Sequence, residues 1–156
     1  MLRPIETLQR RLIDHNLTKY NLHRASNLQQ ETSFILVPGQ VADAASVLCR
    51  GGPKGDKLSL LKRVRRANPN AFILYKPHPD VESNLRRGAL PKKTVLRYAD
   101  DCLENCGAAQ ALESCDEVYT GISLMGFDAL LSGISVTTYG QPFYAGWGFT
   151  NDLGPK

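Results

Sequence analysis

A chain of 156 residues with 42% hydrophobic and 22% charged residues has the composition of one soluble globular domain and hardly leaves room for a second. Its net charge of +4 suits an anionic ligand or an anionic membrane surface but is too weak to indicate nucleic acid. No stretch approaches the roughly 18 apolar residues of a membrane span, and residues 1–16 lack the apolar segment of a secretory signal, so we expect a cytoplasmic protein.

In the cytoplasm, cysteines are expected to be thiols, which here means Cys49, Cys102, Cys106 and Cys115. Cys102 and Cys106 are spaced to share one helical face, but no further ligands stand at a matching spacing, so we predict no metal site.

The first half of the chain alternates helical and strand patterns. Apolar residues at helical spacing predict a helix over 4–15, and the run "FILV" predicts a buried strand over 34–37 that Pro-Gly ends. "DAASVLCR" predicts a helix from Asp43, and a second helical pattern over 56–68 stops before Pro69. Within it, the basic run at 62–66 is expected to be a solvated helix face. "AFILY" at 71–75 predicts the next strand.

The second half continues the alternation. Residues 81–93 are polar and basic and are predicted to be loop, followed by strands at 94–98, 116–120 and 135–140, with helices at 108–115 and 123–133 between them. Strands and helices at this spacing indicate parallel βαβ units, so the expected fold class is α/β, a Rossmann-like doubly wound parallel sheet. We divide the chain into a lead-in segment, 1–30, and one domain, 31–156.

Unusual loops follow four of these strands. They read "PGQVAD" after the first strand, "KPHP" after the second, "TGISLMG" after the strand at 116–120 and "GQPFYAGWG" after the last. In doubly wound sheets the carboxyl ends of the strands form one edge, and ligands bind outside it. The four loops therefore predict a binding site at that edge.

Two of the loops suit an anion. The turn at Ser123 begins a helix whose free N–H groups favour negative charge, and Gly121 and Gly126 would allow close backbone approach; the alternative is a plain serine cap. His78, held between prolines beside Lys76, is placed to donate to a phosphate oxygen, although a single histidine is often structural.

The other two loops suit a polar ligand. Gln40 and Asp43 could orient a hydroxyl, or could simply form a turn and a helix cap. Gln141, Tyr144 and Trp147 combine amide and aromatic groups as sugar sites do, or else pack on a neighbour. No nucleophile elbow, zinc helix, Walker loop or dinucleotide fingerprint is present, and no catalytic residue is assigned.

Four segments, with "LTKYNL" at 17–22, closely resemble the capsule polysaccharide biosynthesis and export family, in particular its KpsC/LipA-type members: "VPGQVADAAS", "NPNAFILYKPHPDV", "DEVYTGISLMGFDALLSG" and "VTTYGQPFYAGWGFTND". The resemblance implies a retaining β-Kdo glycosyltransferase of GT-B fold, with this chain as the C-terminal, nucleotide-donor-binding half. The donor would be CMP-Kdo, with no other cofactor. On that reading Lys76, His78 and Ser123, with the turn from Leu124 to Gly126, hold the CMP phosphate. Gln40 and Asp43 face the cleft, and Gln141, Tyr144 and Trp147 shape the sugar end.

The chain departs from that family in three respects: it has no acidic "EDGFLRS"-type motif, only Asp43 stands where paired acids are common, and it stops where relatives continue. We therefore expect a domain truncated at its C-terminus and inactive alone. Its expected partners are a nucleotide sugar, a lipid-linked saccharide acceptor and a separate N-terminal half or capsule export complex, with no nucleic acid, in the cytoplasm or peripheral to the inner membrane. The alternatives are a non-catalytic interaction module of a capsule assembly complex and a GT-B relative that uses a UDP-sugar.

Overall fold

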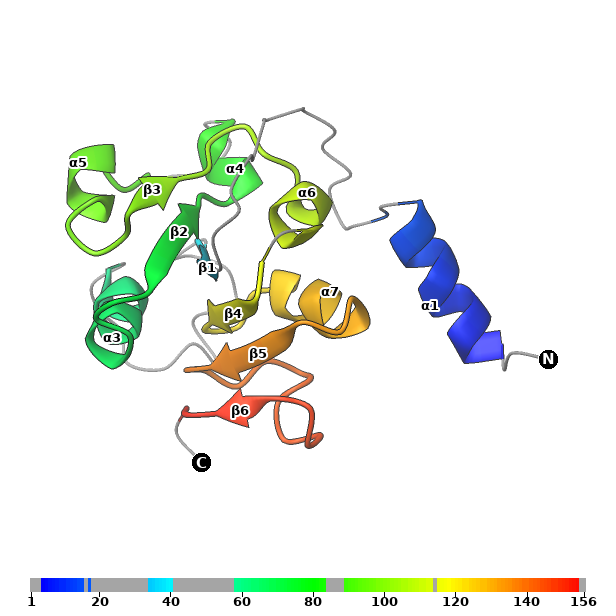
Figure 1. The fold of residues 1–156 in the computed structure, drawn as a ribbon. Coiled ribbons are helices and arrows are strands. Elements are labelled where there is room, and N and C mark those ends of the chain that lie inside the picture. The colour runs from blue at the N-terminus through cyan, green and yellow to red at the C-terminus, as the bar shows by residue number, and fades with distance from the viewer. Residues whose placement is uncertain are drawn as a thin grey trace.

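The computed structural model describes residues 4–15, 17, 34–40, 58–83, 89–113 and 115–154, and these form a parallel sheet flanked by helices (Figure 1). All the strand pairs are parallel, and the strands lie in the order β3-β2-β1-β4-β5-β6. The strands are β1 (Phe34–Pro38), β2 (Phe72–Lys76), β3 (Asp101–Cys102), β4 (Glu117–Thr120), β5 (Ser135–Thr138) and β6 (Asn151–Asp152). The doubly wound α/β fold is thus confirmed.

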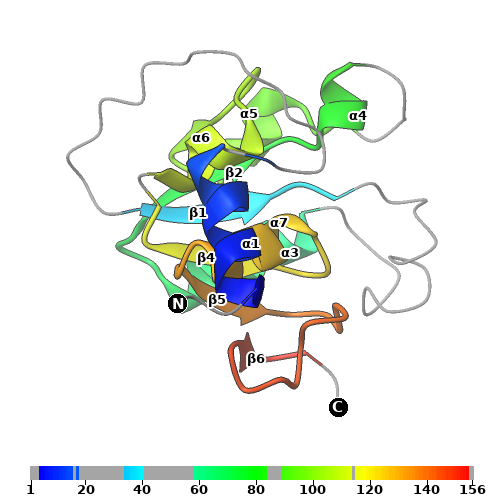
Figure 2. The same ribbon diagram turned by 90° about the vertical axis from the view of Figure 1, so that its right-hand side faces the viewer.

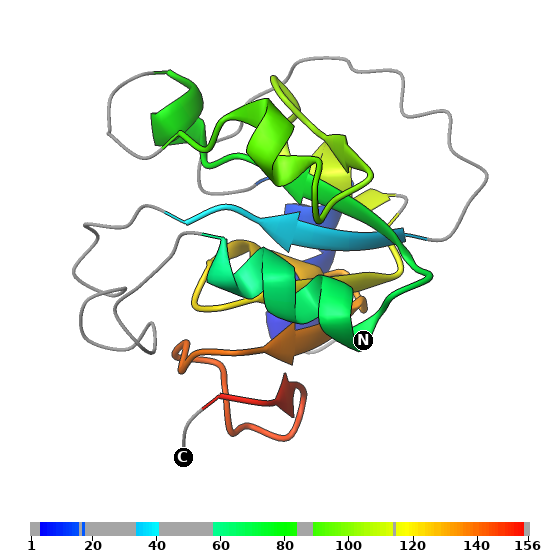
Figure 3. The same ribbon diagram turned by 90° about the vertical axis from the view of Figure 1, so that its left-hand side faces the viewer.

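Helices cover both faces of this sheet. Figure 3 shows α3 (Ser59–Ala67) and α5 (Lys92–Val95) on one side, while α6 (Ala108–Glu113) and α7 (Met125–Leu131) lie on the other. Two apolar clusters result, one of which joins Leu61 and Val64 of α3 to Ile73, and the other Ala129 of α7 to Leu36. β1 is buried at every residue because helices cover both of its faces, which explains its continuous apolar sequence.

The order of the strands creates a switch point beside β1. From β1 the chain adds β2 and β3 on one side, then crosses to add β4, β5 and β6 on the other. The loops that leave β1 and β4 therefore diverge to opposite faces, which is where sheets of this class bind their ligands.

The predicted N-terminal helix is confirmed as α1 (Pro4–Asp14), which packs outside α7 and is nearest the viewer in Figure 2. Gln9 Nε2 donates to Leu131 O over 2.8 Å. Leu12 and Ile13 line a hollow of about 250 Å³ against α6 and α7, while Ile5 and Leu8 remain exposed. The predicted helix from Asp43, like Cys49, lies outside the described residues.

The predicted strand at 94–98 is wrong, and so is part of the predicted loop before it. Residues 92–95 form helix α5, capped by Pro91, and the third strand is β3. A helix satisfies this sequence because it turns Val95 into the core, 1% exposed, while the following turn brings Tyr98 N–H to Val95 O. The short helix α4 (Pro79–Glu82) also occupies the start of the predicted loop, and β6 was not predicted.

The described cysteines are free thiols, but Cys102 and Cys106 do not share a helical face. Cys102 lies in β3 and belongs to the cluster under α3, whereas Cys106 belongs to the cluster under α6 and α7. Burial raises the pKa of the Cys102 thiol to about 11 and that of the Cys115 thiol to about 12, so both remain protonated at neutral pH.

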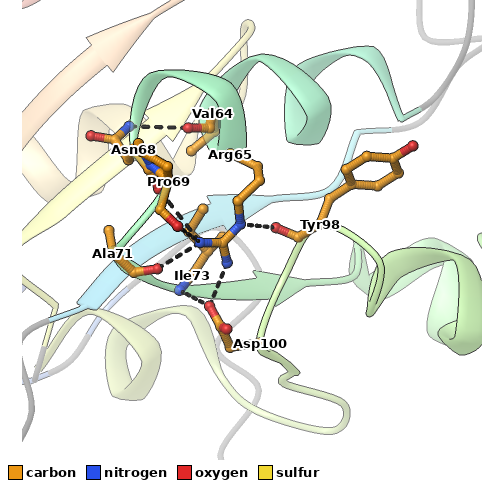
Figure 4. Close-up of polar contacts among 8 residues, drawn as sticks. All are labelled: Val64, Arg65, Asn68, Pro69, Ala71, Ile73, Tyr98 and Asp100. Atoms are coloured by element: carbon orange, nitrogen blue, oxygen red, sulfur yellow. Dashed lines mark hydrogen bonds and ion pairs between the residues drawn. The ribbon is translucent and has the colours of Figure 1, made fainter.

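Arg65 corrects the expectation that the whole basic run of α3 faces solvent. Its Nε donates to Tyr98 O over 2.9 Å, and Nη1 donates to Pro69 O and Ala71 O over 3.1 and 2.8 Å. Nη2 contacts the Asp100 carboxylate at 2.5 Å, and that carboxylate also accepts the Ile73 N–H (Figure 4). One guanidinium thus joins the end of α3 to the start of β2 and to the segment before β3.

We predict that Arg65→Ala lowers the free energy of unfolding by about 2–3 kcal/mol, because three carbonyls and the Asp100 carboxylate lose their contacts with the guanidinium. The matched control is Arg66→Ala, an exposed neighbour on the same helix, which should change it by less than about 0.5 kcal/mol. Urea unfolding followed by circular dichroism measures both. Equal effects in the two variants would show that the network of Arg65 adds nothing to stability.

Candidate functional site at the carboxyl edge of the sheet

The loops after β1, β2, β4 and β5 meet at the carboxyl edge, as the sequence predicted. The Gly39 N–H donates to Lys76 O over 2.7 Å and joins the first two loops. The Tyr139 N–H donates to Thr120 O over 2.8 Å and joins the last two. These bonds hold four sequence-distant segments in one arrangement.

Gln40 spans the switch point. Its Oε1 accepts the N–H of Ile122 over 3.0 Å, so a side chain from the β1 loop holds the backbone of the β4 loop. A Cβ on Gly121 would lie 2.5 Å from Gln40 Nε2, so glycine at this position leaves room for the end of the glutamine side chain. Gln40 therefore fixes the shape of the edge, while Asp43 lies outside the described residues.

His78 caps α4 from the end of the β2 loop. Its backbone is extended, with φ −70° and ψ 137°, and Pro79 follows in the first turn, as the flanking prolines predicted. The imidazole Nδ1 accepts the Asp80 N–H over 3.1 Å. An imidazole that accepts at Nδ1 carries its proton on Nε2, so Nε2 is the donor atom of the His78 ring.

Lys76 lies beneath that turn and is 2% exposed. Its ammonium donates to Pro77 O over 3.4 Å and stands 3.8 Å from the Glu82 carboxylate. Glu82 in turn accepts the N–H of Asn105 over 2.8 Å. Direct contact with a phosphate would require the ammonium to leave Glu82. In this arrangement, Lys76 is a buried positive charge behind the His78 turn.

Ser123 shapes the turn that begins α7. Its hydroxyl accepts the Met125 N–H over 3.3 Å, and its own N–H donates to Thr120 Oγ1 over 3.1 Å. Ser123 is thus a cap, and its hydroxyl proton remains a donor that can point to a ligand. Leu124 follows in the same turn with 37% of its surface exposed.

Tyr144 fastens the aromatic loop to this turn. It is fully buried, and its hydroxyl donates to Ser123 O over 2.5 Å. A Cβ on Gly126 would lie 2.9 Å from Tyr144 Cζ and still closer to the hydroxyl, so Gly126 makes room for the tyrosine. Burial raises the pKa of the Tyr144 hydroxyl, which keeps it a donor. Contact between Tyr144 and a sugar would require this loop to open.

The rest of the aromatic loop remains at the surface. Trp147 is 55% exposed and packs edge-on against Phe143, with ring centroids 5.8 Å apart, and Gln141 is exposed as well. The Gly146 N–H donates to the Asp152 carboxylate over 2.8 Å, and the hydroxyl of Thr150 donates to the same carboxylate over 2.7 Å. These bonds, the one from Thr150 foremost, lower the pKa of Asp152, so this charged group ties the loop to β6.

Three residues at the edge were not singled out from the sequence. Thr120 accepts the Ser123 N–H, Glu82 faces Lys76, and Asp152 holds the aromatic loop. A threonine at the end of a strand and the segment "TND" are too common in sequences to indicate a functional residue. Glu82 and its partner Asn105 are 23 residues apart in the chain. The contacts of Thr120 and Asp152 are with residues only three and six positions away, whereas only the tertiary structure brings Glu82 to Asn105.

A second hollow, of about 640 Å³, lies at the opposite, amino edge of the sheet. Its lining includes Arg65, Asp100 and Asp116. The Asp100 and Asp116 carboxylates accept the N–H groups of Ile73 and Phe34, each over 2.7 Å. These charges terminate strands and hold α3, so we assign the amino edge a structural part and keep the carboxyl edge as the candidate site.

Residues 2–156 match the family model described as "Capsule polysaccharide biosynthesis protein". The capsule polysaccharide modification protein LipA of Neisseria meningitidis serogroup B is 45% identical over 150 residues, 95% of this chain and 21% of LipA. The lipopolysaccharide-processing protein LpsZ of Rhizobium meliloti is 34% identical over 143 residues, 89% of this chain and 32% of LpsZ. The chain therefore spans only about a fifth to a third of these relatives.

Two solved structures of Thermosulfurimonas dismutans KpsC share the fold. The β-Kdo 2,7 transferase matches with a TM-score of 0.73 and 36% identity, over 99% of this chain and 47% of that one. The β-Kdo 2,4 transferase matches with a TM-score of 0.75 and 27% identity, over 97% of this chain and 50% of that one. The likeness covers nearly all of this chain and half of each transferase.

We predict that Tyr144→Phe lowers the free energy of unfolding by about 1–2 kcal/mol, because it removes the hydrogen bond from the buried hydroxyl to the Ser123 carbonyl, which then accepts, among the described residues, only the N–H of Gly126. Tyr98→Phe is the control, since the Tyr98 hydroxyl makes no hydrogen bond within the described part of the chain, and it should cost less than about 0.5 kcal/mol. Chemical unfolding measures both.

Gly126→Ala should cost about 1–3 kcal/mol by overpacking against Tyr144. Combined with Tyr144→Phe, which removes the closest atom, it should cost less than the sum of the two single changes. Strict additivity in this double-mutant cycle would contradict the contact between these residues.

Proposed function

Because this chain belongs to the capsule polysaccharide biosynthesis protein family, we propose that it is the donor-binding part of a Kdo glycosyltransferase, with CMP-Kdo as its donor. The observation that carries the proposal is the 36% identity to a β-Kdo 2,7 transferase over 99% of this chain. That likeness includes the carboxyl edge, whose loops are organised around the switch point where doubly wound sheets bind nucleotides.

The donor phosphate lies between the β2 and β4 loops in this proposal. His78 donates from Nε2 and Ser123 from its hydroxyl to the phosphate oxygens, and the turn from Leu124 to Gly126 lies beside the phosphate. The buried ammonium of Lys76 adds positive charge from behind the His78 turn, where it is shielded from water. A phosphodiester carries one negative charge, which these donors match without a metal ion.

The sugar end of the donor lies toward the β1 and β5 loops. Gln40 holds the switch point and Asp43 follows it, while Gln141 and Trp147 present an amide and an aromatic face. Tyr144 acts indirectly by holding Ser123. In this arrangement hydrogen-bond donors surround the phosphate, and a partly aromatic surface lines the sugar end.

Transfer breaks the bond between the Kdo anomeric carbon and the phosphate, and it needs groups that act on the acceptor hydroxyl. We assign no such group in this chain. The proposal is therefore that the isolated chain binds the donor without transferring its sugar. A lipid-linked saccharide acceptor and a second half-domain, or a capsule export complex, complete the reaction.

One observation favours a second candidate, an interaction module that docks through the aromatic loop. Phe143, Trp147 and Phe149 are 51%, 55% and 73% exposed. Exposed aromatic groups in such number are typical of surfaces that bind another protein. This candidate expects burial of Trp147 in self-association or partner binding and no response to CMP.

We predict that titration with CMP shifts the backbone amide signals of His78, Ser123 and Gly126 in NMR spectra, and that UMP shifts them much less. His78→Ala should weaken CMP binding by about tenfold or more, because one charge-assisted hydrogen bond is lost. His78→Asn should weaken it to a similar extent while preserving the cap of α4, because asparagine is a favourable N-cap residue.

The matched control is His15→Ala, which removes an exposed histidine just beyond α1 and should leave the affinity for CMP unchanged. Wild-type affinity in both His78 variants would refute the phosphate role of that residue. Equal shifts with UMP would favour a relative that uses a UDP-sugar. No shifts in a folded sample, together with self-association, would favour the interaction module.

A further inference from the structure

Lys76 is the only charged residue in the described part of the chain that is buried. Among the described residues, its ammonium contacts the carbonyl of Pro77 at 3.4 Å and the carboxylate of Glu82 at 3.8 Å. Both distances exceed the roughly 2.7–2.9 Å of a close charge-assisted hydrogen bond. A buried ammonium without a close acceptor is unfavourable unless an anion can reach it. The ion pair of Lys76 and Glu82 is therefore a place where an arriving anion would be stabilised.

The side chain of Lys76 lies on the side of the sheet that carries α7. Successive side chains of a strand face opposite sides, so Lys76 shares its side with Leu74, which packs in the cluster under α6 and α7. The turn at Ser123 leads into α7. The ammonium also donates to the carbonyl of Pro77, the residue before His78. This is the region in which the proposed function places the donor phosphate.

Glu82 is anchored by a second contact that does not involve Lys76. Its Oε1 accepts the Asn105 N–H over 2.8 Å, whereas its Oε2 faces the ammonium. Asn105 has φ 57°, a left-handed conformation that asparagine adopts more readily than most residues. The carboxylate is thus held by the loop after β3, whereas the ammonium of Lys76 stands on a flexible four-carbon stem. An anion would separate the pair by moving the lysine and not the glutamate.

A fixed carboxylate beside the ammonium changes how the site responds to the charge of a phosphate. Glu82 repels each negative charge that Lys76 attracts, so the pair adds little to the binding of a further charge. In the proposed function the donor phosphate is a diester with one negative charge. Once the bond between the sugar carbon and the phosphate oxygen breaks, the nucleotide keeps that oxygen and becomes a monoester. Its second pKa is about 6, so it carries nearly two negative charges at neutral pH.

We propose that Glu82 is a specificity-determining residue that lowers the affinity of the site for the doubly charged nucleotide relative to the singly charged diester. It thereby favours binding of the donor and release of the spent nucleotide. Glu82 acts through the ammonium of Lys76 and touches no reacting atom, so it is a positioning residue and not a catalytic one. The inference rests on the proposed function for the position of the phosphate.

The test is NMR titration of the full chain with CMP, with the methyl ester of CMP and with cytidine, which carry about two, one and no negative charges at about pH 7.5. Glu82→Gln removes the charge but keeps an oxygen that can accept the Asn105 N–H. It should bind CMP about tenfold and the methyl ester about threefold more tightly, because the free energy of a charge interaction is proportional to the charge of the ligand. Its affinity for cytidine should equal that of the wild type.

A second variant reverses the sign of the effect. Lys76→Met leaves the charge of Glu82 without its partner, and it should weaken binding of CMP about tenfold and of the methyl ester about threefold, with cytidine unaffected. The matched control is Glu104→Gln, which removes the same charge from an exposed ion pair with Lys92. Because exposed charges are screened by water and salt, the control should change the affinity for CMP less than about twofold. Circular dichroism establishes that each variant is folded.

The outcomes separate this inference from the proposed function. Equal changes for CMP, its methyl ester and cytidine would overturn the inference, because Glu82 would then act on the shape of the site and not on its charge. Wild-type binding of CMP with no gain in Glu82→Gln would also overturn it and leave the proposed donor standing. If no variant binds CMP, the same samples are titrated with inorganic phosphate. Tighter phosphate binding by Glu82→Gln at the amide of His78 would then support the inference and refute only the nucleotide, whereas no response in any variant would refute both.

Discussion

The burial of β1 on both faces and along both edges is the constraint on which the rest of the structure depends. β2 pairs with one edge of β1 and β4 with the other, and helices cover both faces. A strand in that position must be apolar throughout, and the chain must wind outward from it in two directions. The switch point follows from this winding, so the candidate site results from the same condition that makes the core.

The carboxyl edge is held rigid by contacts between loops that are far apart in the chain. Gln40 holds the β4 loop, Tyr144 holds the turn at Ser123, and Glu82 holds both Lys76 and the backbone of Asn105. Each contact places a polar side chain against backbone from another loop. In the proposed function, an edge arranged in this way would keep the His78 and Ser123 donors at a fixed separation before the ligand binds, which would reduce the entropic cost of binding.

The helices on the two sides of the sheet differ in charge among the described residues. The helices α6 and α7 carry Glu113 and Asp128 but no lysine or arginine, and α1 packs on this side, whereas α3 and α5 carry six lysines and arginines. Neighbouring residues of α3 differ in their surroundings: Arg65 bonds the backbone at the start of β2, whereas Arg66 is exposed. Among the helices of the described residues, none is both long and apolar enough to span a bilayer.

The sequence by itself determined the alternation of elements, the doubly wound class, the family and the loops that meet at the carboxyl edge, because periodicity, prolines and glycines act locally. It did not determine the helix at 92–95, because so short a segment fits both a helical and a strand pattern. The burial of Val95 in the core decides for the helix. Only the tertiary structure decided that Lys76 and Tyr144 are buried and that Gly121 and Gly126 make room for side chains. Those outcomes depend on which strands pair, and pairing brings together residues that no local pattern relates.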